Sequence, residues 1–308
     1  MKNIVVIGSL NLDVVEKIDS LPLQGATVRV AGRENNLGGK GANQAVAAAR
    51  QGAHVSFIGA VGDDAAGQMF RETLTAEHID VSGIVTKSVA TGTATILLEA
   101  DGHNTILVFG GANAELNADD VVASEHLIAQ ADIVIAQFEV PQTAVAKAFY
   151  LAKKYGAKTL LNPAPIINQA DIMPEILACT DIIVPNETEA AALVGADPST
   201  NFADLCAIRT AMQRLMIPRS VITLGEAGVF TGLNNASRMV PVFPVKAIDT
   251  TAAGDTFIGA MVAELRSDLK NEYDAIQYAS RASSITVQRP GAMKSIPTRQ
   301  EVLTAGRL

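Results

Sequence analysis

The stretch ADIVIAQFEVPQTAVAKAFYLAKKYGAKTLLN, residues 131–162, decides the fold class. Its apolar runs predict buried strands over Ala131–Gln137 and Thr159–Asn162, and the longer segment between them has the period of a helix over Thr143–Lys154. A strand, a helix and a second strand in this order are typical of a βαβ unit, in which the two strands run parallel.

The same alternation continues on both sides of this unit. Further apolar runs predict buried strands at Asn3–Ile7, Val55–Gly59, Asp181–Val184 and Ser220–Leu224. Segments of helical period accompany them at Ala42–Gln51, Ala65–Glu77, Asp204–Leu215 and Ile258–Arg266. Strands that alternate with helices in this way predict an α/β fold with a doubly wound, mostly parallel sheet flanked by helices.

Two segments break the alternation, Val14–Asn36 and Thr93–Val108. Both are typical of β ribbons, and Asp101-Gly102 inside the second is a strong signal for a two-residue hairpin turn. Because these ribbons lack helices to cover both faces, we expect them to pair with each other as a small sheet beside the main body, where they would form a lid. No linker rich in Pro or Ser interrupts the chain, so residues 1–308 are predicted to form a single domain with a discontinuous lid.

Composition and charge exclude several classes of protein. The 308 residues carry a net charge of −8 without a run of five like charges, so a nucleic-acid partner is not expected. The two cysteines, Cys179 and Cys206, show neither metal-ligand spacing nor a local disulfide pattern. The first apolar run is broken by Gly8 and Ser9, and no apolar run approaches the length of a membrane span. We therefore expect a cytoplasmic protein without a membrane partner.

The segment DTTAAGDTF, residues 249–257, carries the clearest chemical signal. Ala252, Ala253 and Gly254 have little or no side chain, so their backbone N–H groups could surround an anion at the start of the helix that follows. Asp255 would lie at the same helix start, where its carboxylate could accept the proton of a hydroxyl group. The alternative is that Asp255 only caps the helix, as Asp often does.

A second candidate segment is LGGKGANQ, residues 37–44, which leads into a predicted helix. It differs from a Walker A motif, because Gly41 follows Lys40 where Ser or Thr is needed to hold the metal. Its glycines instead indicate a hinge or a close approach of the backbone to a small polar ligand, with Asn43 as a hydrogen-bonding group. The alternative is a tight turn before the helix, in which Lys40 is a solvated loop charge.

Polar residues follow several predicted strands, at the edge where parallel sheets bind ligands. In PNETE, residues 185–189, Asn186 and Glu189 are three positions apart and suit Mg²⁺ bound through water. They suit a helix N-cap with an acidic first turn equally well. Similar polar segments follow other strands at 9–13, 138–139 and 223–228, and this shared position indicates one ligand-binding edge.

Taken together, these segments resemble the PfkB, or ribokinase-like, family of carbohydrate kinases. The resemblance runs through nearly all of the chain and rests on six segments in order: GSLNLD (8–13), GGKGANQAVAAAR (38–50), NPAP (162–165), PNETE (185–189), ITLGEAG (222–228) and DTTAAGDTF (249–257). It implies a doubly wound core with a β lid, and transfer of the γ-phosphoryl group of ATP to a primary hydroxyl of a sugar. D-ribose, phosphorylated at its 5-hydroxyl, is the expected substrate.

Other functions stay open at this point. The alternatives are a related kinase of 2-deoxyribose, fructose or a nucleoside, and a sugar sensor without catalytic activity. The presence of Asp255 argues against a sensor, because binding alone needs no base.

The resemblance also implies roles for individual residues. Asp255 would be the catalytic base, and the backbone of Ala252, Ala253 and Gly254 would stabilise the charge that develops during transfer. The sugar would be bound by Asn11, Asp13, Gly39, Lys40, Asn43, Glu139 and Asp255. ATP would be bound by Asn186, Thr223, Gly225, Gly228, Gly254 and Ser280. Members of the family often have a histidine beside the adenine, where this chain has Ser280.

Two metal ions and a second subunit complete the expectation. Mg²⁺ would bind through water near Asn186 and Glu189. The resemblance places a K⁺ site, formed mostly by backbone carbonyls, at Asp249, Thr251, Thr286, Arg289, Gly291 and Ser295. A homodimer is expected through the lid, because apolar ribbons present edges that a second copy can pair with.

Overall fold

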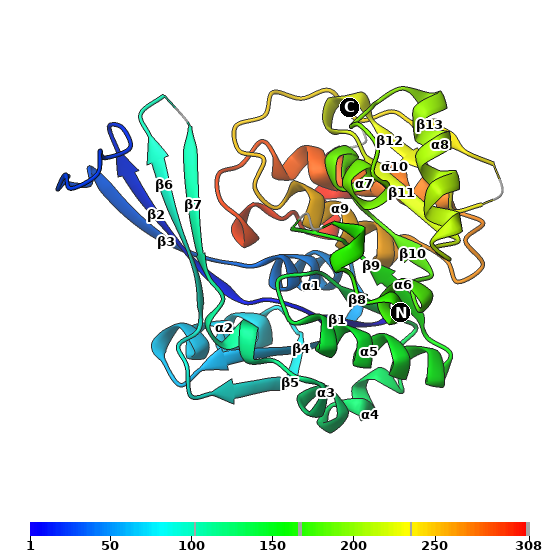
Figure 1. The fold of residues 1–308 in the computed structure, drawn as a ribbon, viewed down its shortest axis with the longest axis horizontal. Coiled ribbons are helices and arrows are strands. Elements are labelled where there is room, and N and C mark those ends of the chain that lie inside the picture. Colours follow the sequence, from blue (N-terminus) through cyan, green and yellow to red (C-terminus); the bar gives the residue numbers. More distant parts are fainter. Residues whose placement is uncertain (102, 166–167, 235, 306–308) are drawn as a thin grey trace.

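The computed structural model describes residues 1–101, 103–165, 168–234 and 236–305, which form a large and a small β-sheet (Figure 1). The strands of the large sheet are β1 (Asn3–Ile7), β4 (His54–Gly62), β5 (Asp80–Lys87), β8 (Ile133–Ala136), β9 (Lys158–Leu161), β10 (Ile182–Ile183), β11 (Arg219–Thr223), β12 (Val229–Thr231) and β13 (Arg238–Val240). Their spatial order is β13-β12-β11-β10-β9-β8-β1-β4-β5. All neighbours from β11 to β5 pair parallel, whereas β12 and β13 add an antiparallel edge.

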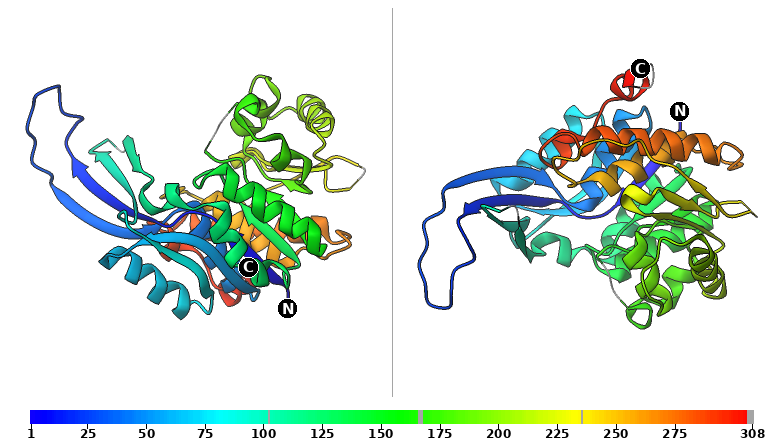
Figure 2. Two further views of the ribbon diagram at one scale, coloured as in Figure 1. Left: turned by 60° about the horizontal axis from the view of Figure 1, so that its bottom comes forward. Right: turned by 90° about the horizontal axis from the view of Figure 1, so that it is seen from above.

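Helices cover both faces of the large sheet (Figure 2). One face packs against α1 (Lys40–Arg50), α2 (Ala65–Ala76), α9 (Ala253–Glu264), α10 (Glu272–Thr286) and α11 (Arg299–Thr304). The other face packs against α3 (Ala118–Ala123), α4 (Glu125–Ile128), α5 (Gln142–Tyr155), α6 (Pro174–Ala178), α7 (Glu187–Val194) and α8 (Phe202–Arg214). No helix within the described ranges is both long and apolar enough to cross a membrane.

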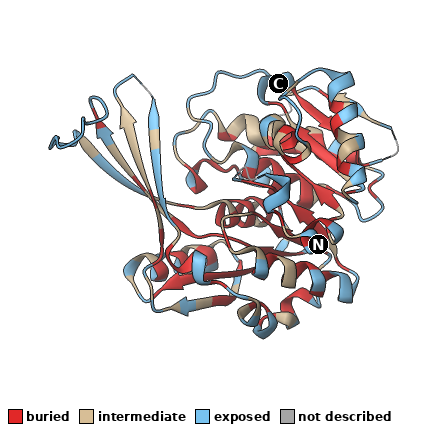
Figure 3. Ribbon diagram, viewed as in Figure 1, coloured by how far each residue is buried: buried red, intermediate tan, exposed pale blue. Residues whose placement is uncertain are grey.

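The central strands are buried on both faces (Figure 3). In β8, Ile133 and Ile135 belong to the core on one side of the sheet, and Val134 and Ala136 belong to the core on the other. Successive side chains of a strand point to opposite faces, so a strand between two helical layers must be apolar at every position. The continuous apolar runs of the sequence have this cause, and the predicted doubly wound sheet is confirmed.

The small sheet comes from two separate parts of the chain. It has the order β3-β2-β6-β7, with β2 (Asn11–Ile18), β3 (Gly32–Gly38), β6 (Gly92–Glu99) and β7 (Asn104–Phe109). The two hairpins join through β2 and β6, which pair parallel, so the predicted pairing of the two ribbons is confirmed. The predicted turn at Asp101-Gly102 falls partly outside the described residues, because Gly102 is not among them.

Two boundaries differ from the sequence prediction. Strand β2 begins at Asn11 and includes Asp13, and residues 19–31 form a long loop instead of strands, which extends away from the body in Figure 2. Helix α9 begins at Ala253, five residues before the predicted start at Ile258. Small residues give no apolar period by which to recognise the first turn, so packing against α1 decides where that helix begins.

Candidate active site

The carboxyl ends of the parallel strands meet at one edge of the large sheet. Glu139 follows β8, Asn162 directly follows β9, and Asn186 follows β10. The start of α1 lies at the same edge, because Lys40 N donates to Glu139 Oε2 over 3.1 Å. The small sheet stands beside this edge (Figure 1). The predicted ligand-binding edge is therefore assembled from both sheets and the start of α1.

Asp255 lies in the first turn of α9 and is only 8% exposed. Asn43 Nδ2 donates to its Oδ2 over 3.0 Å, and Gln44 Nε2 donates to its Oδ1 over 3.0 Å. Burial raises the pKa of Asp255, and the Lys40 ammonium and the two amides offset part of that rise. Side chains of α1 thus bind both carboxylate oxygens of Asp255. A residue that only caps its own helix would not need these contacts to a second helix.

Close packing of α1 on α9 brings the two amides within reach of Asp255. A Cβ at Gly259, one turn after Asp255, would lie 2.5 Å from Ala47 Cβ and 2.6 Å from Gln44 O. Only glycine allows the helices to approach this closely. The small residues of both helices therefore set the distance between Gln44 and the carboxylate.

Four carboxylates and one ammonium form the charged part of the site. Burial, together with Glu139 and Asp255, raises the pKa of Asp13 to about 7. Burial opposes the charge of Lys40, but Asp255, Glu139 and Glu189 together raise the pKa of this lysine. Burial also raises the pKa of Glu189. These charges favour the protonated form of Lys40, a partly exposed residue, and its role in binding a ligand stays a prediction.

Hydrogen bonds join the end of β1 to Glu139. Ser9 Oγ donates to Glu139 Oε2 over 2.5 Å, and Asn11 Nδ2 donates to the same oxygen over 3.5 Å. Asn113 holds Asn11 from the other side, because its Nδ2 donates to Asn11 Oδ1 over 2.8 Å. Polar groups fixed in this way are suited to bind the hydroxyl groups of a small molecule.

Gly39 joins β3 to α1 in a conformation that favours glycine, with φ of 90°. A Cβ at this position would lie 2.8 Å from Asn11 N and 2.9 Å from Ser9 O. Both the conformation and the available space exclude a side chain. Gly39 and Asn11, two of the residues predicted to bind the sugar, are therefore in direct contact.

Asn186 and Glu189 bind each other at the start of α7. Asn186 Oδ1 accepts from Glu189 N over 2.8 Å, and Glu189 Oε2 accepts from Asn186 N over 2.9 Å, which is a reciprocal capping box. Within the described ranges, no group of three or more His, Cys, Asp or Glu residues is arranged to hold a metal ion. Mg²⁺ would therefore need water and phosphate oxygens besides the remaining oxygen of Glu189, a donor set that this ion accepts.

The residues expected to bind ATP lie after β10, at the end of β11, in the turn that follows β11, and on α9 and α10. Asn186 pairs with Thr223 in an isolated parallel bridge, and Gly225 and Gly228 border the turn after β11 with φ of 54° and 108°. Ser280 lies on α10, is 3% exposed, and its Oγ has no hydrogen-bond partner in the described part of the chain. Contact of these residues with ATP stays a prediction.

The segment at the start of α9 carries the three residues expected to form an anion site, Ala252, Ala253 and Gly254. Ala252 precedes the helix with φ of 60°, a left-handed conformation that residues other than glycine rarely adopt. Ala253 N donates to Thr250 O over 3.2 Å, so this amide is already bound. A Cβ at Gly254 would meet nothing within 4 Å. Of the three residues expected to stabilise the transferred group, Gly254 is exposed, whereas Ala252 and Ala253 are partly buried.

Two segments carry the residues expected to bind K⁺, and hydrogen bonds hold these segments together. Asp249 accepts from Thr251 N over 2.9 Å and from Gly291 N over 2.8 Å. Although burial opposes the charge, these hydrogen bonds lower the pKa of Asp249. A carboxylate kept in its anionic form supplies the negative charge and the oxygen atoms that would suit K⁺.

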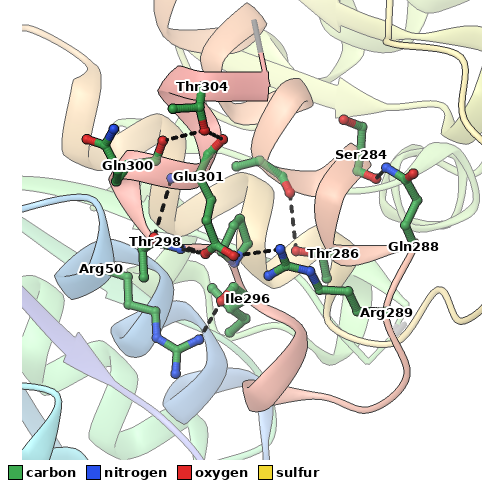
Figure 4. Close-up of polar contacts among 12 residues, drawn as sticks. Arg50, Ser284, Thr286, Gln288, Arg289, Ile296, Thr298, Gln300, Glu301 and Thr304 are labelled. Atoms are coloured by element: carbon green, nitrogen blue, oxygen red, sulfur yellow. Dashed lines mark hydrogen bonds and ion pairs between the residues drawn. The ribbon is translucent and has the colours of Figure 1, made fainter.

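The second of these segments is anchored by α11 and by α1 (Figure 4). Arg289 pairs with Glu301 over 2.6 Å, and Thr298 N donates to the other oxygen of Glu301 over 2.7 Å. Arg50 donates to the carbonyl of Ile296. The segment also reaches α9, because Thr286 Oγ1 donates to Thr256 Oγ1 over 3.0 Å. Thr286, one of the residues expected to bind the cation, thus contacts the first turn of the helix that carries Asp255.

Four buried polar residues that sequence reasoning did not single out hold the site together: Asn113, Gln44, Gln137 and Asn162. Gln44 directly follows Asn43, and the last two each follow a strand directly. Both are the last residues of strands predicted from the sequence, and a polar residue at the carboxyl end of a buried parallel strand is the signal that could have found them.

Comparison with known proteins identifies relatives of this chain. The pfkB family carbohydrate kinases match residues 1–299 of the chain. A ribokinase of Staphylococcus aureus is 42% identical over 302 residues, which are 97% of this chain and 98% of that protein. A bifunctional ribokinase/ribose-5-phosphate isomerase A of Fructilactobacillus sanfranciscensis is also 42% identical over 98% of this chain, which spans 56% of that longer protein.

A solved structure is similar over the whole chain. The structure of Arabidopsis thaliana ribokinase complexed with ribose and ATP has a TM-score of 0.91 and 29% sequence identity, covering 100% of this chain and 99% of that one. The chain belongs to the PfkB family of carbohydrate kinases.

Proposed function

We propose that this chain transfers the γ-phosphoryl group of ATP to the 5-hydroxyl of D-ribose, with Asp255 as the general base. ATP-dependent phosphorylation of ribose is the activity named for its relatives at 42% identity over nearly its full length. The observation that carries the role of Asp255 is its buried carboxylate, which Asn43 and Gln44 hold at the ligand-binding edge.

Each group has a task in the transfer. Asp255 accepts the proton of the 5-hydroxyl as that oxygen forms its bond to the γ-phosphorus, and ADP leaves with the electrons of the broken P–O bond. The amide of Gly254, at the N-terminus of α9, stabilises the charge on the phosphoryl oxygens. Lys40 supplies a positive charge beside the carboxylates.

The sugar binds among the polar groups at the ends of β1, β8 and β3. Asn43 is 5% exposed, and its Oδ1 has no hydrogen-bond partner in the described part of the chain. A buried acceptor without a partner is costly unless a ligand supplies a donor, and a sugar hydroxyl is such a donor. Asn11, Asp13 and Glu139 bind the remaining hydroxyls of the sugar.

Two sets of residues would hold metal ions. Asn186 and Glu189 would hold Mg²⁺ through water, and the bound ion would supply positive charge to the phosphates of ATP. Asp249, Thr251, Thr286, Arg289, Gly291 and Ser295 would hold K⁺ beside the backbone that leads into Gly254. ATP lies along Asn186, Thr223, Gly225, Gly228 and Gly254, with its adenine beside Ser280.

The small sheet covers the sugar and pairs with a second copy of the chain. Strand β7 is an edge of this sheet, and Val108 and Phe109 on it are 65% and 56% exposed. Exposed apolar residues on an edge strand favour association with another strand. Sedimentation equilibrium should therefore give twice the 32.2 kDa mass of one chain, and Val108→Lys should shift the mass toward one chain. A monomeric parent protein would contradict the dimer.

The experiment that tests the catalytic role is the Asp255→Asn substitution. ADP formation is measured with ribose and Mg²⁺-ATP in the presence of K⁺, with 2-deoxyribose, fructose and a nucleoside as alternative acceptors. Loss of a positioned base should lower kcat by roughly 10²–10⁴-fold, while calorimetry still detects ATP binding. Turnover near that of the parent would remove Asp255 from the proposed role, and a better alternative acceptor would replace ribose.

A further inference from the structure

Gln44 is a buried glutamine beside the base, and the proposed reaction gives it no direct task. It is fully buried, and its Nε2 donates both to Asp255 Oδ1 over 3.0 Å and to Asn162 Oδ1 over 3.1 Å. Its Oε1 accepts from Gln137 Nε2 over 2.6 Å. Both amide hydrogens and the amide oxygen are thus used, and a turned amide would face two acceptors with its oxygen. The orientation of Gln44 is therefore fixed.

The partners of Gln44 are themselves anchored to the large sheet. Asn162 directly follows β9, and its Nδ2 donates to Val184 O over 2.9 Å, just beyond β10. Gln137 directly follows β8 and is fully buried. Three neighbouring strand ends consequently hold one side chain, and that side chain holds the carboxylate of Asp255.

We propose that Gln44 is a positioning residue that fixes the carboxylate of Asp255 by its Oδ1, so that Oδ2 meets the sugar hydroxyl. This inference rests on the proposed role of Asp255 as the base. Asn43, which binds Oδ2, still has an unpartnered oxygen and can exchange its contact when sugar enters. Gln44 already uses both of its amide hydrogens and its amide oxygen, so it cannot exchange its contact in this way. The two adjacent amides therefore divide the work: Asn43 belongs to the sugar site, and Gln44 holds the base.

The charge around Asp255 predicts a second effect of Gln44. The groups that face this carboxylate are Lys40, Asn43 and Gln44 from α1, Glu139 after β8, Asp13 from β2 and Glu189 from α7. A hydrogen bond from an amide favours the ionised form of a carboxyl group. Loss of the Gln44 donor therefore raises the pKa of Asp255 further, and moves the acid limb of the pH–rate profile to higher pH.

The test compares Gln44→Met with Gln51→Met. Gln51 directly follows the same helix, is 3% exposed, and makes its side-chain hydrogen bonds to Pro297 and Tyr278, away from Asp255. We expect Gln44→Met to lower kcat by about 10- to 100-fold, because a base displaced by about 1 Å loses rates of this order. The KM for ribose should change by less than about threefold. The acid limb of the pH profile of kcat should move to higher pH. Gln51→Met should keep kcat and the acid limb of the parent.

A double substitution separates positioning from a general effect on the fold. In an Asp255→Asn background, Gln44→Met should lower the residual kcat by less than about twofold, because residues that act as a unit are not additive. Three results would overturn the proposal: a parent-like kcat with an unshifted acid limb, an equal loss in Gln51→Met, or full additivity in the double variant. If Gln44→Met does not fold by circular dichroism, the isosteric Gln44→Glu replaces it, with the same expected loss and shift. A normal Asp255→Asn enzyme would instead refute the proposed base itself.

Discussion

Lys294 Nζ donates a hydrogen bond to Asn36 Oδ1 over 2.8 Å. Asn36 lies on β3 of the small sheet, and Lys294 lies in the turn Met293–Ser295 after α10. The contact joins the small sheet to the segment expected to bind K⁺. The orientation of the small sheet therefore depends in part on this turn.

The substitution Lys294→Met should weaken ribose binding without changing the chemical step. Methionine keeps most of the side-chain length and removes the donor. One exposed hydrogen bond contributes about 1 kcal/mol or less, so the KM for ribose should rise by about two- to fivefold at constant kcat. Lys270→Met, at a lysine whose side chain is 81% exposed, is the matched control. A lower kcat with an unchanged KM would show that the contact serves the phosphoryl site instead of the small sheet.

Asp13 should make ribose binding depend on pH near neutrality. Its pKa is raised to about 7, so the carboxyl is protonated below this pH and ionised above it. An ionised carboxylate accepts more hydroxyl hydrogen bonds, so the affinity for ribose should fall as the pH decreases from 8 to 6, by about tenfold at most for a single group of this pKa. Calorimetry with ribose in the absence of ATP measures affinity without turnover, and it keeps Asp255, one of the charges that raise this pKa.

The control for this pH dependence is Asp13→Asn. An amide does not titrate in this range, so the variant should bind ribose more weakly than the parent at pH 8 and with nearly the same affinity at pH 6 and pH 8. If the parent shows an affinity independent of pH over this interval, Asp13 is either ionised throughout or not in contact with the sugar.

Replacement of K⁺ should lower turnover more than it weakens sugar binding. Asp249 links Thr251 to Gly291, and Ser283 Oγ donates to Ala253 O over 2.8 Å, so the expected cation segments adjoin the amide of Gly254. A donor that acts only in the transition state affects kcat more than KM. The measurement is kcat and KM for ribose in K⁺, Na⁺ and tetramethylammonium at constant ionic strength. Equal kcat in all three would remove the cation from the mechanism.

Much of the fold could be predicted because it depends on local patterns. Apolar runs such as Ile133–Ala136 are continuous because helices cover both faces of the sheet, and this composition is visible without coordinates. The candidate residues that follow strands, such as Glu139 and Asn186, could be predicted for a related reason. Parallel strands end at a common edge, so their order in the chain already brings these residues together.

The order of short segments along the chain was also enough to identify the family. DTTAAGDTF and GGKGANQ lie more than 200 residues apart, and the sequence alone placed both at helix starts. It could not show that Gln44 and Asn43 bind the two oxygens of Asp255. That contact depends on the close approach of α1 and α9 at Gly259, which no local pattern encodes.

Only the tertiary structure determined the pKa shifts in the site and which residue binds which carboxylate. The pKa of Asp13 is raised to about 7 because β2 carries this side chain into a partly buried site that it shares with Glu139 and Asp255. In the sequence these three carboxylates are separated by more than 100 residues, and their interaction follows from distance and burial. Sequence determined which groups are present and at which edge they lie; packing determined how strongly each one holds its proton and which partner holds it in place.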